Sequence, residues 1–188
     1  MNNREFLQDE YSQFYSKFYG ITGDHTSAVD VICEIRRNIK DKSSTILEYG
    51  CATGFNLKYF QLEGFTDLWG IDGYEKFIEI ANSEKSSVNF HHCNFALDDF
   101  KISIKYDIIF TRGVLQQGRT QKEKIKNNDD NVKRILSTCR DAIKETGTII
   151  LAEGKVREWE QLASAAGLEV SRQKILNDHQ ICFLKRRN

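Results

Sequence analysis

The chain has 188 residues, of which 40% are hydrophobic and 29% charged, values that are ordinary for a folded protein of one domain. Lys plus Arg and Asp plus Glu each total 27, so the formal net charge is zero. A protein that binds nucleic-acid backbones usually shows a basic excess, and no apolar run approaches the roughly 18 residues that span a bilayer. We therefore expect neither a nucleic-acid partner nor a membrane partner.

The N-terminus and the cysteines predict a cytoplasmic protein. The first residues, MNNREFLQDEYSQF, lack the apolar segment of a signal peptide. The five cysteines are widely spaced, odd in number and without a C-x-x-C pair, which is typical of reduced thiols. His91, His92 and Cys93 do not predict a metal site, because alternation along a strand places the two histidines on opposite faces.

Residues 1–42 are predicted to be helical, with aromatic residues at three- and four-residue steps between Tyr11 and Tyr19. Such a stripe is either a face packed on the core or part of a lid over a site, and both readings stay open. After residue 44, strand-like and helix-like stretches alternate, which indicates an α/β domain with a mainly parallel sheet. Strands are expected at 45–49, 67–72, 88–92, 106–110 and 148–152, and helices at 55–63, 74–82, 132–144 and 159–166.

The C-terminal part has a different pattern. Two strand-like stretches, 168–176 and 179–184, flank the turn-forming pair Asn177-Asp178, which predicts an antiparallel hairpin. The expected fold is therefore a doubly wound α/β sheet of seven strands, mostly parallel with an antiparallel last strand. A helical cap at 1–42 and a Rossmann-like core at 43–188 would together form a single domain.

The strongest chemical pattern is an acidic residue followed by a turn of small residues. Glu48 stands two positions before Gly50, and Ala52 and Gly54 follow at the end of the first predicted strand. Such a turn lets a ligand approach the backbone closely. A carboxylate there would repel the pyrophosphate of a dinucleotide, but it suits a cationic ligand such as S-adenosylmethionine (SAM). The pattern therefore favours SAM over NAD.

This stretch resembles motif I of the class I SAM-dependent methyltransferases, usually (D/E)-x-G-x-G-x-G, with Ala52 at the middle glycine. The likeness to the family's fold covers roughly residues 40–185. It implies SAM as the cofactor and S-adenosylhomocysteine as the product. It also implies that Glu48 orients the methionine amino group, directly or through water, and that residues 50–54 line the methionine and ribose.

Asp72 ends the second predicted strand, 24 residues after Glu48. A carboxylate there can accept both ribose hydroxyls, although alone it would equally well cap a helix. By resemblance, Asn94 would contact the adenine amino group and Phe95 would offer an N–H and an apolar wall; Asn94 could also simply form a turn. The expected cofactor-binding residues are Glu48, Gly50, Cys51, Ala52, Gly54, Asp72, Gly73, Asn94, Phe95 and Thr111.

The sequence F-T-R-G-V-L at 110–115 corresponds to the place where the family's fourth strand opens onto the transferred methyl group. The chain has no proline, so it lacks the (N/D/S)-P-P-(Y/F) of enzymes that methylate nucleic-acid bases or glutamine side chains. This motif resembles that of small bacterial methylases associated with sugar biosynthesis, in which G-V-L is commonly followed by Ile-His. Gln116-Gln117 replaces that pair here, so a histidine base is absent from this position.

The catalytic group stays unidentified at this level. Candidates facing the expected pocket are Tyr15, Tyr19, His25, Arg112 and Gln117, and the expected substrate-binding residues are Tyr15, Tyr19, Arg112 and Gln116. The polar stretch 116–131 is expected to be a solvated loop or a substrate contact.

We expect transfer of a methyl group from SAM to a small-molecule acceptor by in-line displacement, because only residues 1–42 and 116–131 are left to select a substrate. A peptide or protein methyltransferase is the alternative enzyme, and a catalytically silent SAM-binding partner subunit is another. An NAD-dependent oxidoreductase is opposed by Glu48 and by the G-x-A-x-G spacing. A monomer or a homodimer is expected.

Overall fold

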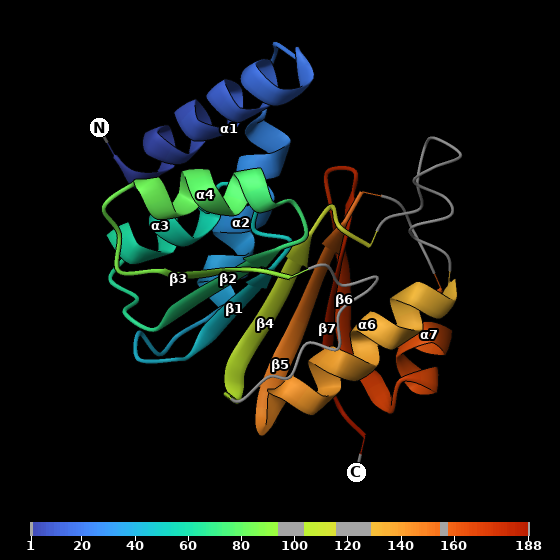
Figure 1. The fold of residues 1–188 in the computed structure, drawn as a ribbon. Helices are drawn as coiled ribbons and strands as arrows, with labels where there is room; N and C mark the ends of the chain where they lie inside the picture. The colour runs from blue at the N-terminus through green and yellow to red at the C-terminus, as the bar shows by residue number, and fades with distance from the viewer. Residues whose placement is uncertain (1, 94–103, 116–128, 155–157, 188) are drawn as a thin grey trace.

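The computed structural model describes residues 2–93, 104–115, 129–154 and 158–187 (Figure 1). The predicted site residues Asn94, Phe95, Gln116 and Gln117 lie outside these ranges. The strands are β1 (Ile46–Tyr49), β2 (Leu68–Asp72), β3 (Asn89–His92), β4 (Tyr106–Arg112), β5 (Ile143–Glu153), β6 (Leu168–Leu176) and β7 (His179–Arg186). The helices are α1 (Asn3–Tyr19), α2 (Thr26–Asn38), α3 (Phe55–Leu62), α4 (Glu75–Ser83), α6 (Asp129–Ala142) and α7 (Trp159–Ala165).

The strands form one seven-stranded sheet in the order β3-β2-β1-β4-β5-β7-β6. β7 runs antiparallel to both of its neighbours, and the other pairings are parallel. The prediction of a doubly wound sheet with a reversed last strand is therefore confirmed. The chain order changes direction at β1, where β2 lies on one side and β4 on the other, and such a switch point is where open α/β sheets bind ligands.

Helices cover both faces of the sheet (Figure 1). α1 to α4 contribute buried residues to one apolar cluster, and α6 and α7 contribute to a second cluster on the opposite face. Alternation along each strand sends successive side chains to opposite clusters: Phe110 joins the first and Ile109 the second. No helix in the described ranges is both long enough and apolar enough to cross a bilayer.

α1 closes over this first face by means of its aromatic stripe. Asn2 begins the helix with a capping box, and Gly20 ends it in the left-handed conformation. Tyr11 and Phe14 are buried, and the Phe14 ring packs on Phe55 of α3 at 5.2 Å between ring centroids. The inner part of the stripe is therefore a core face.

The boundary between α6 and β5 differs from the expected one. The sequence pattern predicts a helix to 144 and a strand from 148, but α6 ends at Ala142 and β5 begins at Ile143. Ile143 continues the apolar period of the helix, yet it pairs with Tyr106 of β4. The register then shifts, so that Thr148 is the partner of Ile108. Four residues are thus taken up by an irregularity that periodicity alone does not indicate.

Candidate functional site

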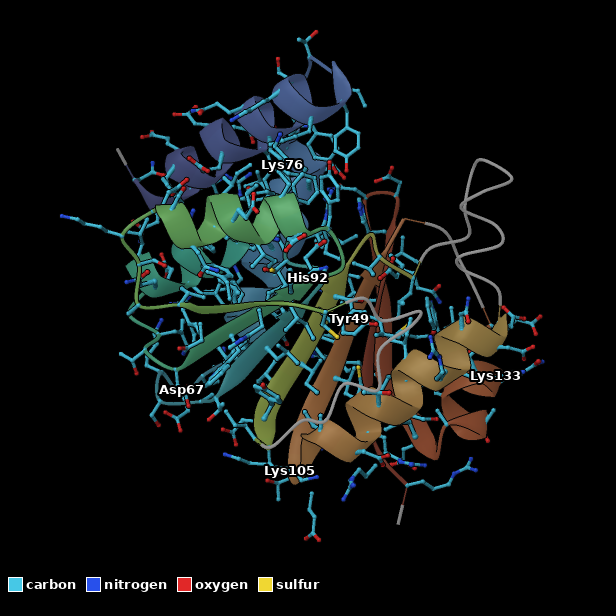
Figure 2. The ribbon with its side chains drawn as sticks, viewed as in Figure 1. Tyr49, Asp67, Lys76, His92, Lys105 and Lys133 are labelled. Atoms are coloured by element: carbon cyan, nitrogen blue, oxygen red, sulfur yellow. The ribbon has the colours of Figure 1, made fainter. Side chains whose placement is uncertain are left out.

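The motif residues meet at the edge formed by the carboxyl ends of the parallel strands. Glu48, Asp72 and Arg112 occupy the last or penultimate positions of β1, β2 and β4. Asp67 and Lys105, which precede β2 and β4, mark the opposite edge in Figure 2. Tyr49 lies on the sheet face toward α6 (Figure 2), so Glu48 beside it faces α1 to α3.

The turn between β1 and α3 has the conformation that its small residues predict. Gly50 and Gly54 have φ values of 81° and 80°, and Ala52 has a φ of 48°. A Cβ on Gly54 would lie 2.2 Å from Cζ of Phe90, and a Cβ on Gly50 would lie 2.3 Å from Cγ2 of Val114. Both glycines are therefore required by packing as well as by backbone conformation.

Glu48 is a buried carboxyl group with one satisfied oxygen. Its side chain is 1% exposed, and its Oε1 accepts a 2.6 Å hydrogen bond from Nδ2 of Asn56 on α3. Oδ1 of Asn56 in turn accepts a 3.0 Å bond from the Tyr11 hydroxyl of α1. Oε2 of Glu48 is inaccessible and has no partner within the described residues.

The surroundings of Glu48 disfavour its charged form. The pKa of Glu48 is raised to about 8: burial is the largest cause and nearby Asp72 adds to it, whereas Asn56 and Arg112 act in the opposite direction. An unpartnered buried carboxyl oxygen is costly unless a ligand supplies a donor or a positive charge. The site can therefore accept a cationic group at Oε2.

Asp72 links the turn after β1 to the turn after β2. Its Oδ2 accepts a 2.9 Å bond from the N–H of Ala52, and its Oδ1 accepts a 2.9 Å bond from the N–H of Tyr74. The second bond forms a local turn, but Asp72 does not cap α4, because the N-cap residue of that helix is Tyr74 and no side chain caps it. Each carboxylate oxygen can accept a further hydrogen bond, so the group can also bind a diol.

The end of β4 brings together three of the candidate residues. Nη1 of Arg112 donates to the Tyr15 hydroxyl at 3.1 Å, and the guanidinium lies 5.0 Å from the centroid of the Tyr11 ring. His25, just before α2, stacks on Tyr15 at 4.8 Å between ring centroids. Tyr19 lies at the exposed margin of this group: its ring is 5.6 Å from the Tyr15 ring between centroids, and the residue is 57% exposed.

Thr111 lies on the other side of the strand from Arg112, where a buried carboxyl group holds the next turn. Its hydroxyl donates to Oε1 of Glu153 at 2.8 Å, and Oε2 of Glu153 accepts from the N–H of Leu115 at 3.1 Å. The pKa of Glu153 is raised to about 7, because burial outweighs the opposing effect of these hydrogen bonds. The Thr111 side chain is therefore directed to Glu153.

Sequence reasoning missed Asn56, Glu153 and the pair Asp178–His179. Oδ1 of Asp178 contacts Nδ1 of His179 at 3.0 Å and accepts from the Ser27 hydroxyl at 3.0 Å. Asn56 carries a detectable signal, because it is a polar residue within the otherwise apolar start of α3. The hydrogen bonds from Thr111 to Glu153 and from Ser27 to Asp178 join segments that are far apart in sequence.

The remaining predicted positions are less informative. Cys51 is buried, and Gly73 is exposed at the surface. None of the five cysteines, all of which are described, forms a disulfide. Within the described ranges, no group of three His, Cys, Asp or Glu residues could hold a metal ion.

Comparisons with known proteins agree with this architecture. The family model described as "Methyltransferase domain" matches residues 40–181. The DhpI–S-adenosylhomocysteine complex matches with a TM-score of 0.71 and 15% identity, covering 98% of this chain and 95% of that chain. A TehB-like SAM-dependent methyltransferase from Corynebacterium glutamicum has a TM-score of 0.68 and 15% identity, with 96% and 98% covered.

A further match comes from a complex of the Haloferax volcanii Trm112 methyltransferase activator with a methyltransferase, with a TM-score of 0.71 and 13% identity over 97% and 98% of the two chains. No curated protein matches the sequence significantly. The family match covers most of the chain, and the strand order agrees with it. This chain belongs to the methyltransferase domain family and is a SAM-dependent methyltransferase of class I fold.

Proposed function

We propose that this protein transfers the methyl group of SAM to a small-molecule acceptor by in-line displacement. The observation that carries the proposal is the unpartnered Oε2 of Glu48, buried beside the left-handed turn at Gly50–Gly54. SAM supplies a methyl group already activated by a positive sulfonium. The chain therefore needs chiefly to bind and orient the two reactants and to exclude water.

The residues at this edge fit SAM. Glu48 would hold the methionine ammonium, for which a buried acidic oxygen without a donor is suited. The backbone of this left-handed turn would lie against the methionine and ribose, while Val114 and Phe90 pack where a Cβ on Gly50 or Gly54 would stand. The free acceptor capacity of Asp72 would take the ribose hydroxyls.

A small acceptor is supported by the way α1 covers the edge. The hydrogen bond between Arg112 of β4 and Tyr15 of α1 holds the helix against the end of β4. This strand is the neighbour of β1, whose Glu48 would bind the methionine ammonium. We propose that α1 and α2 form the cap of the same domain and restrict the acceptor to a small compound. In the cytoplasm, where we expect this protein, such compounds are free metabolites.

The structural neighbour in complex with Trm112 suggests a second candidate function, in which the chain acts on a larger acceptor together with a partner subunit. Two measurements separate these proposals. Calorimetric titration with S-adenosylhomocysteine, with NAD as the negative control and a Glu48→Ala/Asp72→Ala variant alongside, tests the cofactor site. Transfer of a labelled methyl group from SAM to either a metabolite mixture or a polypeptide fraction then tests the acceptor.

Binding of S-adenosylhomocysteine that is lost in the variant, with label in the metabolite fraction, supports the proposal. Label only in polypeptide would replace the small-molecule acceptor with a protein acceptor. Binding without turnover in either fraction would favour a silent SAM-binding subunit.

A further inference from the structure

Arg112, at the end of β4, forms no ion pair with any acidic side chain among the described residues. A guanidinium has five N–H donors, and in the described part of the chain only Nη1 of Arg112 has a hydrogen-bond acceptor, the Tyr15 hydroxyl. Its Nε is inaccessible to solvent and unpartnered among those residues. Arg36 also has an unpartnered Nε, but its Nη2 pairs with Oε2 of Glu63 at 2.8 Å.

The neighbours of Arg112 add donors rather than acids. The Tyr15 ring that accepts from Arg112 also stacks on His25, whose Nε2 is buried and has no partner within the described ranges. Burial lowers the pKa of His179 on β7, and the positive charge of nearby Arg112 lowers it further. Its Nδ1 is held by Asp178. Groups from α1, β4, β7 and the residue before α2 thus surround one place.

The acids near this place are already engaged or are oriented elsewhere. Asp178 accepts from Ser27 and contacts His179. Glu153 accepts from Thr111 and Leu115 on the opposite face of the sheet. Glu48 is on the same face as Arg112, but it forms no ion pair with it, and its free oxygen is assigned above to an ammonium.

The register of the sheet leaves Arg112 beside a small neighbour. Arg112 is the partner of Ala152 on β5, and Ala152 is the partner of Ile181 on β7. All three side chains belong to the α1 face of the sheet, and the middle one is a methyl group. A ligand group on this side of Glu48 would lie over β4 and β5, away from Asp72 on β2.

We propose that the methyl acceptor is an anion, a small molecule whose carboxylate or phosphate pairs with the guanidinium of Arg112. A buried or half-buried charge is stable only when it is paired, and the planar fork of arginine matches an oxyanion in two parallel hydrogen bonds. The unpartnered nitrogen of His25 adds a polar contact to the same site. This inference rests on the proposed function, since it names the chemical class of that acceptor.

The test uses protein saturated with S-adenosylhomocysteine, so that the carboxylate of the cofactor is already in place. Inorganic phosphate and benzoate are the anionic probes, and benzamide is the neutral analogue of benzoate. Calorimetry gives their affinities, and the ¹⁵N–¹H signal of Arg112 Nε reports directly on the proposed contact. The variants are Arg112→Gln, Arg112→Lys and the control Arg172→Gln, because Arg172 lies over the Phe183 ring, away from these residues.

We expect phosphate or benzoate to bind and to shift the Arg112 Nε signal, while benzamide does neither. Arg112→Gln should weaken the anion at least tenfold, Arg112→Lys should weaken it less, and Arg172→Gln should leave it unchanged. The Nε signal in the unaltered protein keeps the test decisive even if Arg112→Gln folds poorly.

Two results would overturn the proposal. One is a complex with S-adenosylhomocysteine that binds neither anion. The other is that Arg112→Gln weakens the binding of S-adenosylhomocysteine but not of 5′-methylthioadenosine, which lacks the carboxylate, while the anions fail to bind. Arg112 would then bind the carboxylate of the cofactor itself. If S-adenosylhomocysteine does not bind at all, the proposed cofactor site fails instead, and the same anion titration on the protein alone still decides the role of Arg112.

Discussion

Replacing Glu48 with glutamine should stabilise the protein while removing its affinity for the cofactor. The pKa of Glu48 is raised from 4.5 to about 8, chiefly by burial. Between these two pH values the folded state holds a proton that the unfolded state has lost, so the free energy of unfolding falls by about 1.4 kcal/mol for each pH unit. At pH 7 the cost is about 3 kcal/mol, and glutamine, which keeps an acceptor for Asn56, avoids it.

Chemical denaturation of the ligand-free proteins at pH 4, 6 and 8 measures this difference. The stabilising effect of Glu48→Gln should be near zero at pH 4, where the carboxyl group is protonated in both states, and should increase up to about pH 8. A difference that is constant across the series, or a variant that is less stable at pH 7, would refute the raised pKa as its cause.

The same titration predicts how binding depends on pH. A ligand ammonium at Oε2 favours the ionised carboxylate, so S-adenosylhomocysteine should bind about tenfold more tightly for each pH unit between roughly 5 and 8, with release of about one proton. Calorimetry in two buffers of different ionisation enthalpy counts that proton. Affinity that is independent of pH, without proton release, would mean that the ammonium is held elsewhere.

Three further variants test the frame of the site. Gly54→Ala should destabilise the fold by about 2–5 kcal/mol in denaturant titrations, because it adds a clash with Phe90 to the strain of the left-handed backbone. The control Gly64→Ala, at a φ of 89° with open space around it, should lose only about 1–2 kcal/mol of stability. Equal losses in the two variants would show that the clash with Phe90 contributes nothing. Asp72→Asn should weaken the binding of S-adenosylhomocysteine about 10- to 100-fold by calorimetry, whereas an unchanged affinity would leave Asp72 only its hydrogen bonds from the N–H groups of Ala52 and Tyr74. Glu153→Ala should lose about 2–5 kcal/mol of stability, as it leaves two buried donors unsatisfied; a loss below about 1 kcal/mol would mean that this carboxyl group does not hold the turn after β4.

The parts of the site that lie close together in sequence could be predicted from it. Glu48, Gly50 and Gly54 belong to a single strand-to-helix turn. Their residue types and spacing therefore predict both the backbone conformation of the turn and a positive charge on the ligand. Asp72 follows from the regular length of one strand–helix–strand unit. The family match and the sheet order confirm the fold that these residues predict.

The contacts that cross the sheet could not be predicted in the same way. Tyr15 and Arg112 are 97 positions apart in sequence, and their hydrogen bond depends on how α1 crosses the end of β4. The pairing of Glu153 with Thr111 depends on the register of β5, which is shifted by an irregularity after Ile143. Periodicity reports which face a residue occupies, but it does not report the neighbour that a shifted register provides.

The distribution of unsatisfied polar atoms supports a site at this edge independently of any motif. Five buried side-chain nitrogen or oxygen atoms in the described residues have no partner, and three of them belong to Glu48, Arg112 and His25. Folded chains satisfy most such atoms, and the exceptions tend to lie where a ligand completes the structure. Here one acidic oxygen and two nitrogens lie along the ends of β1 and β4 and beneath α1. An ammonium at Glu48 on β1 and an oxyanion at Arg112 on β4 would satisfy these atoms with groups of opposite charge. We therefore assign the cofactor ammonium to the end of β1 and the acceptor to the end of β4.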